Sequence, residues 1–165
     1  MAQSRRNTRL RDLTTYGRSR AVRLADYDYA GDADVHLTIH AEEGTQPTES
    51  ATAKMICDSI EFCSGKLRYR LYGYALMPDH LHVLLSPAES KVPLRDWLRD
   101  FKSFTTNQHM KRRGRPLWQR SANDHVCRTA ETAEVVLAYI VNNPVRARLV
   151  ERWQDWPWTK VFIEI

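Results

Sequence analysis

The chain has 165 residues, 42% of them hydrophobic, which is enough for one globular domain with a substantial core. No stretch of about 18 apolar residues is present, and no apolar segment follows the basic residues near the N-terminus. We therefore expect neither a membrane span nor a secretory signal, and a cytoplasmic location. The net charge of +5 permits a polyanionic partner such as nucleic acid without requiring one.

Positive charge gathers in two parts of the chain. Residues 1–30 show no clear helical or strand periodicity, and we interpret them as a basic N-terminal arm ahead of one domain formed by residues 31–165. Such an arm either contacts phosphates or is simply solvated, and both alternatives stay open. The second cluster lies in the middle of the chain. The candidate DNA-binding residues of the two clusters are Arg5, Arg6, Arg9, Lys111, Arg112, Arg113 and Arg115.

The hydrophobic pattern predicts a strand and then a helix at the start of the domain. From Val35 to His40, apolar residues alternate with histidine and threonine, which is typical of a half-buried strand. After turn-forming residues, apolar side chains recur at helical spacing from Met55 to Cys63, and Gly65 is the expected stop of this helix.

Five further elements are predicted along the remaining chain. In order, they are a strand over 68–77, a strand over 80–86, a helix over 94–111, a short strand over 124–128 and a helix over 129–141. Thr129 is the expected N-cap of the last helix, and Pro144 is expected to follow its end closely.

This order indicates an α+β protein with the ferredoxin-like split βαβ arrangement. In that arrangement four strands form an antiparallel sheet with the first and third strands at its centre. Two helices cover one face, and the appended C-terminal helix can lie across the open face.

A His-x-His pair begins the third predicted strand. Because side chains alternate along a strand, His80 and His82 share one face, with Cα atoms roughly 6 to 7 Å apart. Two ring nitrogens can converge on one cation from that separation, although two partly exposed strand histidines are the simpler interpretation. His36 and His40 of the first strand could add ligands, but polar residues on an open sheet face are the favoured interpretation.

The segment Met77-Pro78-Asp79-His80-Leu81-His82 resembles the HUH motif of single-tyrosine transposases and relaxases, and in particular that of the REP-associated tyrosine transposases. Residues 117–120 with 124–128 resemble the family's segment leading into the tyrosine helix, and residues 153–159 resemble its C-terminal Trp-Pro-Trp element. The resemblance covers roughly Val35 to Thr159.

The resemblance assigns roles to four residues. Tyr139, ahead of Asn143-Pro144-Val145, matches the nucleophile, and His80, His82 and Asn143 match the metal ligands, with Mg²⁺ or Mn²⁺ as the expected divalent metal. From the residues alone, Tyr139 is more simply a core side chain with its hydroxyl satisfied. Pro144 disfavours helical geometry at Asn143, so the direction of that side chain stays open.

The expected function is a metal-dependent single-tyrosine transposase or endonuclease. It would cleave and rejoin single-stranded DNA hairpins, which in the family are REP-like palindromes, through a 5′-phosphotyrosine intermediate, and act as a monomer or homodimer. Arg120 and His125 are further candidate DNA contacts, with a structural hydrogen bond as the alternative for His125. Two other functions remain open: a non-catalytic single-stranded nucleic-acid-binding module on the same fold, and a hydrolytic metal nuclease without a covalent intermediate.

Overall fold

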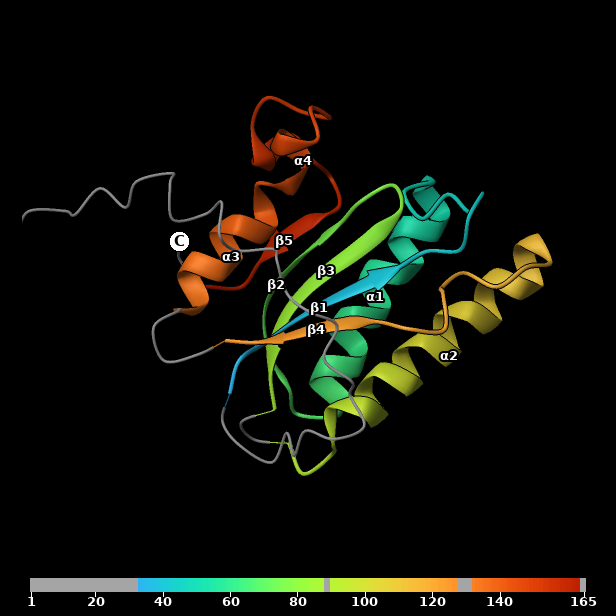
Figure 1. Ribbon diagram of the computed structural model, residues 1–165. Coiled ribbons are helices and arrows are strands. Elements are labelled where there is room, and N and C mark those ends of the chain that lie inside the picture. Colours follow the sequence, from blue (N-terminus) through green and yellow to red (C-terminus); the bar gives the residue numbers. More distant parts are fainter. Residues whose placement is uncertain (1–32, 88–89, 128–131, 164–165) are drawn as a thin grey trace, which may run out of the picture.

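The computed structural model describes residues 33–87, 90–127 and 132–163. The predicted residues Arg5, Arg6 and Arg9, and the whole 1–30 arm, lie outside these ranges. Figure 1 shows the elements in space. They are β1 (Val35–His40), α1 (Ser50–Lys66), β2 (Arg70–Leu76), β3 (His80–Ser86), α2 (Leu94–Arg113), β4 (Asn123–Val126), α3 (Ala133–Val141), α4 (Asn143–Arg146), the 3₁₀ helix η2 (Trp153–Asp155) and β5 (Thr159–Val161).

The sheet confirms the predicted topology and extends it by one strand. Its order is β4-β1-β3-β2-β5, and each neighbouring pair is antiparallel. The first four strands therefore have the ferredoxin-like arrangement with β1 and β3 at the centre. The three-residue β5, which the sequence did not predict, pairs with β2 at the edge.

Two helices cover one face of the sheet, and a shorter helix covers part of the other (Figure 1). The apolar alternate residues of β1 and β3 point to α1 and α2, where Trp97, Phe101 and Leu37 are fully buried. On the opposite face, Val136, Leu137 and Ile140 of α3 pack on Leu84 and its neighbours. The histidine-bearing alternate positions of β1 and β3 therefore lie on the face that α3 partly covers.

Helix boundaries differ from the sequence prediction at two places. α1 continues past Gly65 to Lys66, and Arg68, with φ 57°, adopts the left-handed conformation that normally favours glycine. The N-cap of α3 is Thr132, whose hydroxyl accepts a hydrogen bond from the Val135 amide. The prediction of Thr129 as this cap was wrong, because a start at Thr132 already places the apolar residues of α3 on the sheet; Thr129 itself lies outside the described residues.

A close approach of backbone to side chain fixes α3 against the sheet. Gly73 of β2 lies at a shift in the register between β2 and β3. A Cβ atom at Gly73 would lie 2.6 Å from Leu137 Cδ1 and 2.7 Å from the Lys160 carbonyl oxygen. The absence of a side chain at this position therefore lets α3 and β5 pack closely on β2.

Within residues 33–87, 90–127 and 132–163, no helix combines the length and the hydrophobicity that a membrane span requires.

Candidate active site

The two histidines of the His-x-His pair face each other at the start of β3. The Nε2 atoms of His80 and His82 lie 2.9 Å apart, and the ring planes are nearly perpendicular, at 88°. His82 is buried, with 6% of its surface exposed, whereas His80 is half-buried. The His80 side of the pair is therefore partly open to solvent, whereas the His82 side is closed.

Each ring of the pair has a polar partner at its other nitrogen. The Nδ1 atom of His80 lies 2.6 Å from Oδ1 of Asp79. The Nδ1 atom of His82 lies 2.9 Å from Nε2 of His36 and 3.2 Å from Oγ1 of Thr38. Such outer partners fix the orientation of an imidazole whose remaining nitrogen binds a metal.

His36 and His40 lie on the same face of the sheet as the pair. His36 is buried, at 6% exposure, with its ring centroid 6.3 Å from that of Tyr139 on α3, so the favoured interpretation of an open sheet face was wrong for His36. His40 lies directly opposite His80 in the β1–β3 register, with ring centroids 5.7 Å apart. The antiparallel pairing of the two central strands brings these rings together. The sequence predicted that the two strands are neighbours, but it did not predict which residues lie opposite one another.

Burial keeps the His82 ring neutral. Its pKa is well below the ordinary value, first because burial penalises the charged form and then because nearby His36 and His80 would repel a second positive charge. A neutral imidazole has one nitrogen lone pair available for a cation. Burial thus favours the form of His82 that can serve as a ligand.

The nitrogen geometry fits a divalent cation. Two ligand atoms at about 2.1 Å from one octahedral ion, at a right angle, are roughly 3 Å apart. The 2.9 Å between the two Nε2 atoms of His80 and His82 is close to this value. In the part of the chain that the structure describes, no group of three or more His, Cys, Asp and Glu side chains could hold a metal ion. The fit therefore concerns only the two imidazole nitrogens of His80 and His82.

Tyr139 of α3 lies over the buried end of this cluster. The centroid of its ring is 6.3 Å from that of His36 and 6.4 Å from that of His82, and both contacts are edge-on. The guanidinium carbon of Arg146 lies 4.8 Å from the centre of the same ring. Tyr139 is half-buried against the smaller apolar cluster. The structure therefore brings the predicted nucleophile and the predicted ligand pair to one face of the sheet.

Asn143 lies one helical turn beyond Tyr139 and bonds to the end of α3. Its Nδ2 atom donates to the carbonyl oxygens of Tyr139 and Ile140, at 3.0 and 3.1 Å. This side chain therefore caps the helix that carries the tyrosine. Its assignment as a metal ligand stays a prediction.

Comparison with known proteins gives one curated relative. A Haemophilus influenzae protein, named provisionally as a REP-associated tyrosine transposase, is 29% identical over 103 residues. The match covers 55% of this chain and 58% of that protein, so it spans less than two thirds of the relative's length. No protein-family profile matches the chain.

Comparison with solved structures finds a similar fold. The structure of a REP-associated tyrosine transposase bound to a REP hairpin has a TM-score of 0.66, with 19% identity over 86% of this chain and 81% of that one. The chain resembles the REP-associated tyrosine transposases in sequence and in fold. A provisionally named transposase from Deinococcus radiodurans has a TM-score of 0.49 at 19% identity, covering 75% of this chain and 97% of its own.

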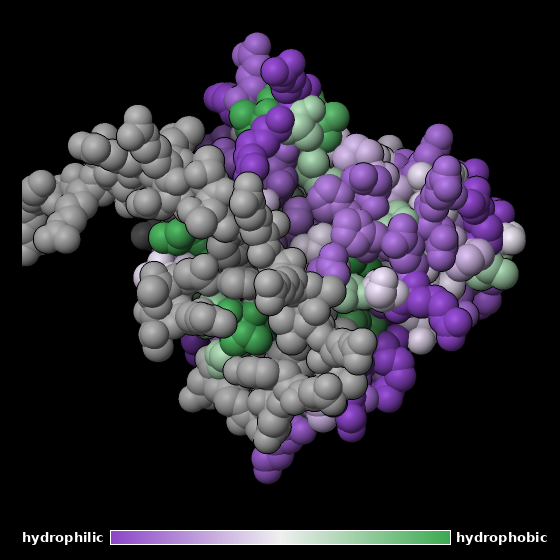
Figure 2. Space-filling model, in the orientation of Figure 1, coloured by the Kyte–Doolittle hydropathy of each residue, from purple (hydrophilic) through white to green (hydrophobic). Residues whose placement is uncertain are grey.

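The second cluster of positive charge, predicted from the sequence to contact DNA, lies at the end of α2. Lys111, Arg112 and Arg113 form the last turn of the helix, which Gly114 ends in the left-handed conformation. The surface over this end of α2, at the right of Figure 2, is mostly hydrophilic. The four positive charges of residues 111–115 are therefore concentrated at one edge of the domain.

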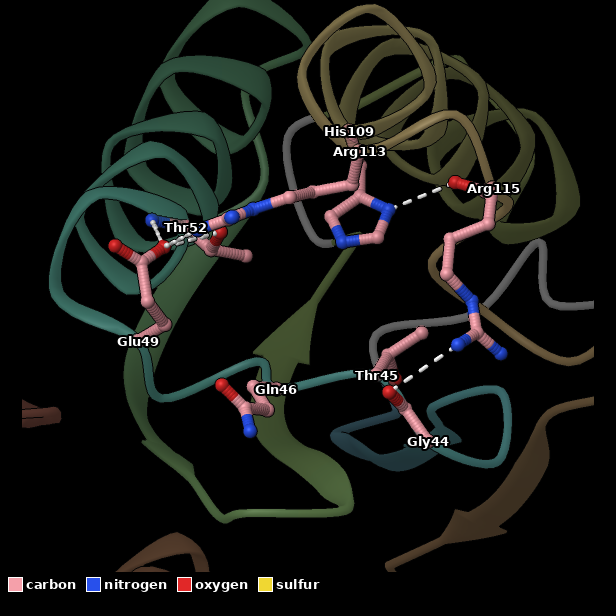
Figure 3. A pocket seen from close by; sticks show the side chains of 8 residues that line it. All are labelled: Gly44, Thr45, Gln46, Glu49, Thr52, His109, Arg113 and Arg115. Carbon is pink, nitrogen blue, oxygen red and sulfur yellow. Dashed lines mark hydrogen bonds and ion pairs between the residues drawn. The ribbon is translucent and has the colours of Figure 1, made fainter.

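A polar pocket of about 220 Å³ opens beside this basic turn (Figure 3). Arg113 lies 3.4 Å from the Glu49 carboxylate, and Arg115 donates to the carbonyl oxygens of Glu43 and Gly44. The Nδ1 atom of buried His109 donates to the Arg115 carbonyl oxygen. Its other nitrogen points into the pocket (Figure 3). Arg113 and Arg115 thus hold the loop before α1, and contact with DNA stays a prediction for both.

The last two predicted DNA contacts lie between α2 and α3. The Arg120 side chain is exposed, and Lys102 Nζ donates to its backbone carbonyl oxygen at 3.0 Å. His125 is on β4, where its backbone pairs with that of His36. The structure does not bring Arg120 and the α2 turn into the histidine cluster, so any DNA they contact extends beyond that cluster.

Proposed function

We propose that the chain is a metal-dependent single-tyrosine transposase or endonuclease. It cleaves and rejoins single-stranded DNA next to hairpins, through a 5′-phosphotyrosine intermediate. The observation that carries this proposal is the position of the Tyr139 ring, 6.3 and 6.4 Å from the rings of His36 and His82. A nucleophile and a pair of imidazoles on one face of a sheet match the requirements of phosphoryl transfer.

Tyr139 supplies the covalent chemistry. Its phenolic oxygen attacks the phosphorus of a phosphodiester, a new bond forms between that oxygen and phosphorus, and the bond to the 3′ oxygen breaks. The phenol gives up its proton in this step, and the 3′ oxygen leaves as a hydroxyl once it has taken a proton, so the exchange of esters is balanced. Because a phenol with an ordinary pKa near 10 is a better leaving group than an alcohol, a second 3′ hydroxyl can reverse the reaction without ATP.

The remaining residues hold the reactants in place. His80 and His82 would hold Mg²⁺ or Mn²⁺, which when bound neutralises charge on a nonbridging phosphate oxygen. Arg146, whose guanidinium carbon lies 4.8 Å from the Tyr139 ring centre, is positioned to contact a phosphate beside the tyrosine. Asn143 holds the end of α3 and thereby the position of the tyrosine.

Hairpin DNA is the proposed substrate for two reasons. The solved relative is described as bound to a REP hairpin, and the last turn of α2 adds phosphate-binding charge away from the histidine cluster. A hairpin with a single-stranded flank can span both regions, with the flank at Tyr139 and the stem along the basic edge. The chain acts in this proposal as a monomer or homodimer.

Adduct formation tests the proposal directly. The full chain is incubated with Mn²⁺ and a labelled pool of hairpin oligonucleotides with randomised stems and single-stranded flanks, and the products are separated under denaturing conditions. We expect a protein–DNA adduct that is lost with EDTA and in Tyr139→Phe. Tyr74→Phe is the matched control, because the Tyr74 hydroxyl donates to Glu61 on the helical face and should be dispensable.

The other outcomes separate the alternatives. Cleavage without an adduct would support a hydrolytic nuclease, and retention of DNA without cleavage would support a binding module. An adduct that persists in Tyr139→Phe would contradict the assignment of the nucleophile.

A further inference from the structure

We propose that the polar pocket between α1 and α2 binds one unpaired nucleotide of the DNA, with its base against His109 and Gln46. The expected base is one with an exocyclic amino group, namely adenine, cytosine or guanine, and thymine is the expected weakest ligand. This inference rests on the DNA substrate of the proposed function. It adds a place, outside the histidine cluster, where the identity of a base is read.

His109 closes the buried end of the pocket. The residue is on α2 and only 4% exposed, and its Nδ1 atom lies 2.8 Å from the Arg115 carbonyl oxygen. Because a carbonyl oxygen only accepts, Nδ1 carries a hydrogen, and Nε2 of the neutral ring has a lone pair. Nε2 points into the pocket, and nothing within the described residues bonds to it (Figure 3). This buried acceptor therefore requires a donor that enters the pocket.

Gln46 provides a second polar group, at the mouth of the pocket. It is exposed, and in the part of the chain that the structure describes its side-chain amide has no hydrogen-bond partner. An exocyclic amino group of a base has two N–H donors, one for His109 Nε2 and one for the Gln46 oxygen. Thymine has a single N–H, which lies between two carbonyl oxygens. The two acceptors together therefore favour the amino-bearing bases.

The two arginines of the pocket wall suit a phosphate at the rim. Arg113 lies 3.4 Å from the Glu49 carboxylate, and Arg115 donates to two backbone carbonyl oxygens of the loop before α1. Figure 3 shows their side chains on opposite sides of His109. Both arginines are exposed, and a guanidinium has five N–H donors, so each keeps donors for a phosphate outside the pocket. Donors at the rim and an acceptor at the buried end match a nucleotide better than a free anion.

The pocket has the size of a single base. Its volume is about 220 Å³. Pockets for drug-sized ligands measure roughly 300 to 1,000 Å³, so this one suits a molecule of one or two rings and excludes a base pair. Gly44, with φ 74°, has the left-handed conformation that glycine favours, and a Cβ atom there would lie 3.2 Å from Nη1 of Arg115. The wall of the pocket therefore depends on a glycine at this position.

The pocket lies close to the histidine end of the sheet. β1 ends at His40, and the next amide, that of Ala41, donates to the Asp79 carbonyl oxygen at 2.9 Å. Gly44 of the pocket is four residues after His40, so the two Cα atoms are at most about 14 Å apart. A DNA strand that leaves the histidine cluster can therefore reach the pocket around the end of β1.

Mononucleotides test the pocket apart from the rest of the DNA. The full chain is titrated with dAMP, dCMP, dGMP or dTMP in the presence of EDTA, and the backbone amide signals of Gly44 and Thr45 are followed by NMR. Because thymine makes one hydrogen bond fewer, we expect dTMP to bind roughly 2- to 12-fold more weakly than the other three. Equal affinity for all four, an equal response to inorganic phosphate alone, or no response would overturn the inference.

Two variants test the residues. In His109→Asn the amide nitrogen can still donate to the Arg115 carbonyl oxygen, but nothing replaces Nε2, so the affinity for all four nucleotides should fall by roughly 2- to 12-fold. In Gln46→Ala the three amino-bearing nucleotides should bind as weakly as dTMP. Because Gln46 is exposed, this second variant should keep the fold even if the buried substitution at His109 does not.

Asn107→Ala is the matched control, because Asn107 is an exposed side-chain amide on α2 that does not line the pocket. It should keep the affinities of the unaltered chain and the discrimination against thymine. A loss of discrimination equal to that in Gln46→Ala would reject the pocket as the binding site.

Sequencing of the hairpins that the chain retains from the randomised pool separates this inference from the proposed function. Thymine should be depleted at one unpaired position with the unaltered chain, and not with Gln46→Ala. Depletion without any DNA adduct would keep the inference and reject strand transfer. An adduct without depletion would do the opposite.

Discussion

The two faces of the central strands differ in composition although both come from the same two short segments of the sequence. In β1 and β3, alternate positions such as Leu37 and Val83 are completely buried under α1 and α2, and the positions between them carry His36, Thr38 and His82. The period of two along a strand separates the two sets without any additional element. A pair of strands can thus supply a core on one side and a site on the other.

Coverage of the two faces also differs. The long helices α1 and α2 close the first face completely, whereas the nine-residue α3 buries only part of the second. Under α3, His82 and Leu84 are buried, while His80 and His40 beyond it stay half-buried. The short helix therefore both excludes water from one half of the histidine cluster and leaves the other half open to a ligand.

The largest expected effect is on the helical face. Phe101 is fully buried and stacks on Trp97 with ring centroids 5.4 Å apart. Phe101→Ala should lower the free energy of unfolding by about 3 to 5 kcal/mol, because the cavity adds to the lost transfer energy. Urea unfolding measures the change. If the two faces are as distinct as the structure indicates, the folded variant should keep the Mn²⁺ affinity of the unaltered chain.

Phe104→Ala on the same helix is the control. Phe104 is 50% exposed, so its loss should change the unfolding free energy little. A large loss of Mn²⁺ affinity in Phe101→Ala, at an unchanged folded fraction, would contradict the independence of the two faces.

The second expected effect concerns the junction of α3 with the sheet. Gly73→Ala should lower the unfolding free energy by about 1 to 3 kcal/mol, because the new Cβ would meet Leu137 and the Lys160 carbonyl. The displacement of α3 should also reduce adduct formation by Tyr139. Gly65→Ala is the control, since a Cβ there meets nothing within 4 Å inside α1, and it should be neutral or stabilising. Equal stability of both variants would mean that α3 is not fixed at Gly73.

Most of the fold could be predicted from the periodicity of hydrophobic residues and from the residues that end helices and form turns. The alternation from Val35 to His40 and the His-x-His strand gave both central strands, and the order of elements gave the topology. β5 was missed because Thr159-Lys160-Val161 has only one aliphatic residue and is too short to show an alternation of apolar and polar residues. Pro144 was expected only to follow the end of α3, but it also lies in the first turn of α4, where its missing N–H is not needed.

The site was predicted less completely than the fold. His80 and His82 were singled out from the alternation along their strand, and Tyr139 through the family resemblance. His36 was considered as a further ligand, but its contact with His82 was not predicted. Its contact with His82 is diagonal, because the residue directly opposite His82 is Thr38, and the sequence does not specify this register. The hydrogen bonds of the Asn143 amide also depend on where α3 ends, which sequence places only within a few residues.

A smaller effect, on DNA affinity, is expected from the basic residues at the end of α2. Affinity for duplex DNA such as a hairpin stem falls with salt by a slope of about 0.9 per neutralised phosphate. The double variant Lys111→Ala with Arg113→Ala should therefore reduce the salt slope of hairpin binding by about 1.8 and weaken binding at low salt. Fluorescence anisotropy over a salt series measures both. Arg99→Ala is the control, because its guanidinium already binds Asp96 and Asp100, and an equal change there would indicate a nonspecific charge effect.

The smallest expected effect concerns the carboxylate beside that basic edge. Hydrogen bonds from Thr52 lower the pKa of Glu49, the N-cap of α1, to about 2 from an ordinary 4.5. A lowered folded-state pKa means that the carboxylate stabilises the fold above about pH 4.5, and that this contribution is lost as the pH falls toward 2. The stability difference between the unaltered chain and Glu49→Gln, from urea unfolding, should therefore shrink between pH 6 and about pH 2. Thr52→Ala should move the Glu49 pKa, measured by NMR titration, back toward 4.5, because the largest cause of the shift is gone. A Glu49 pKa that stays near 2 in Thr52→Ala would show that the backbone amides of the cap and Arg113, and not the Thr52 hydroxyl, hold the carboxylate ionised.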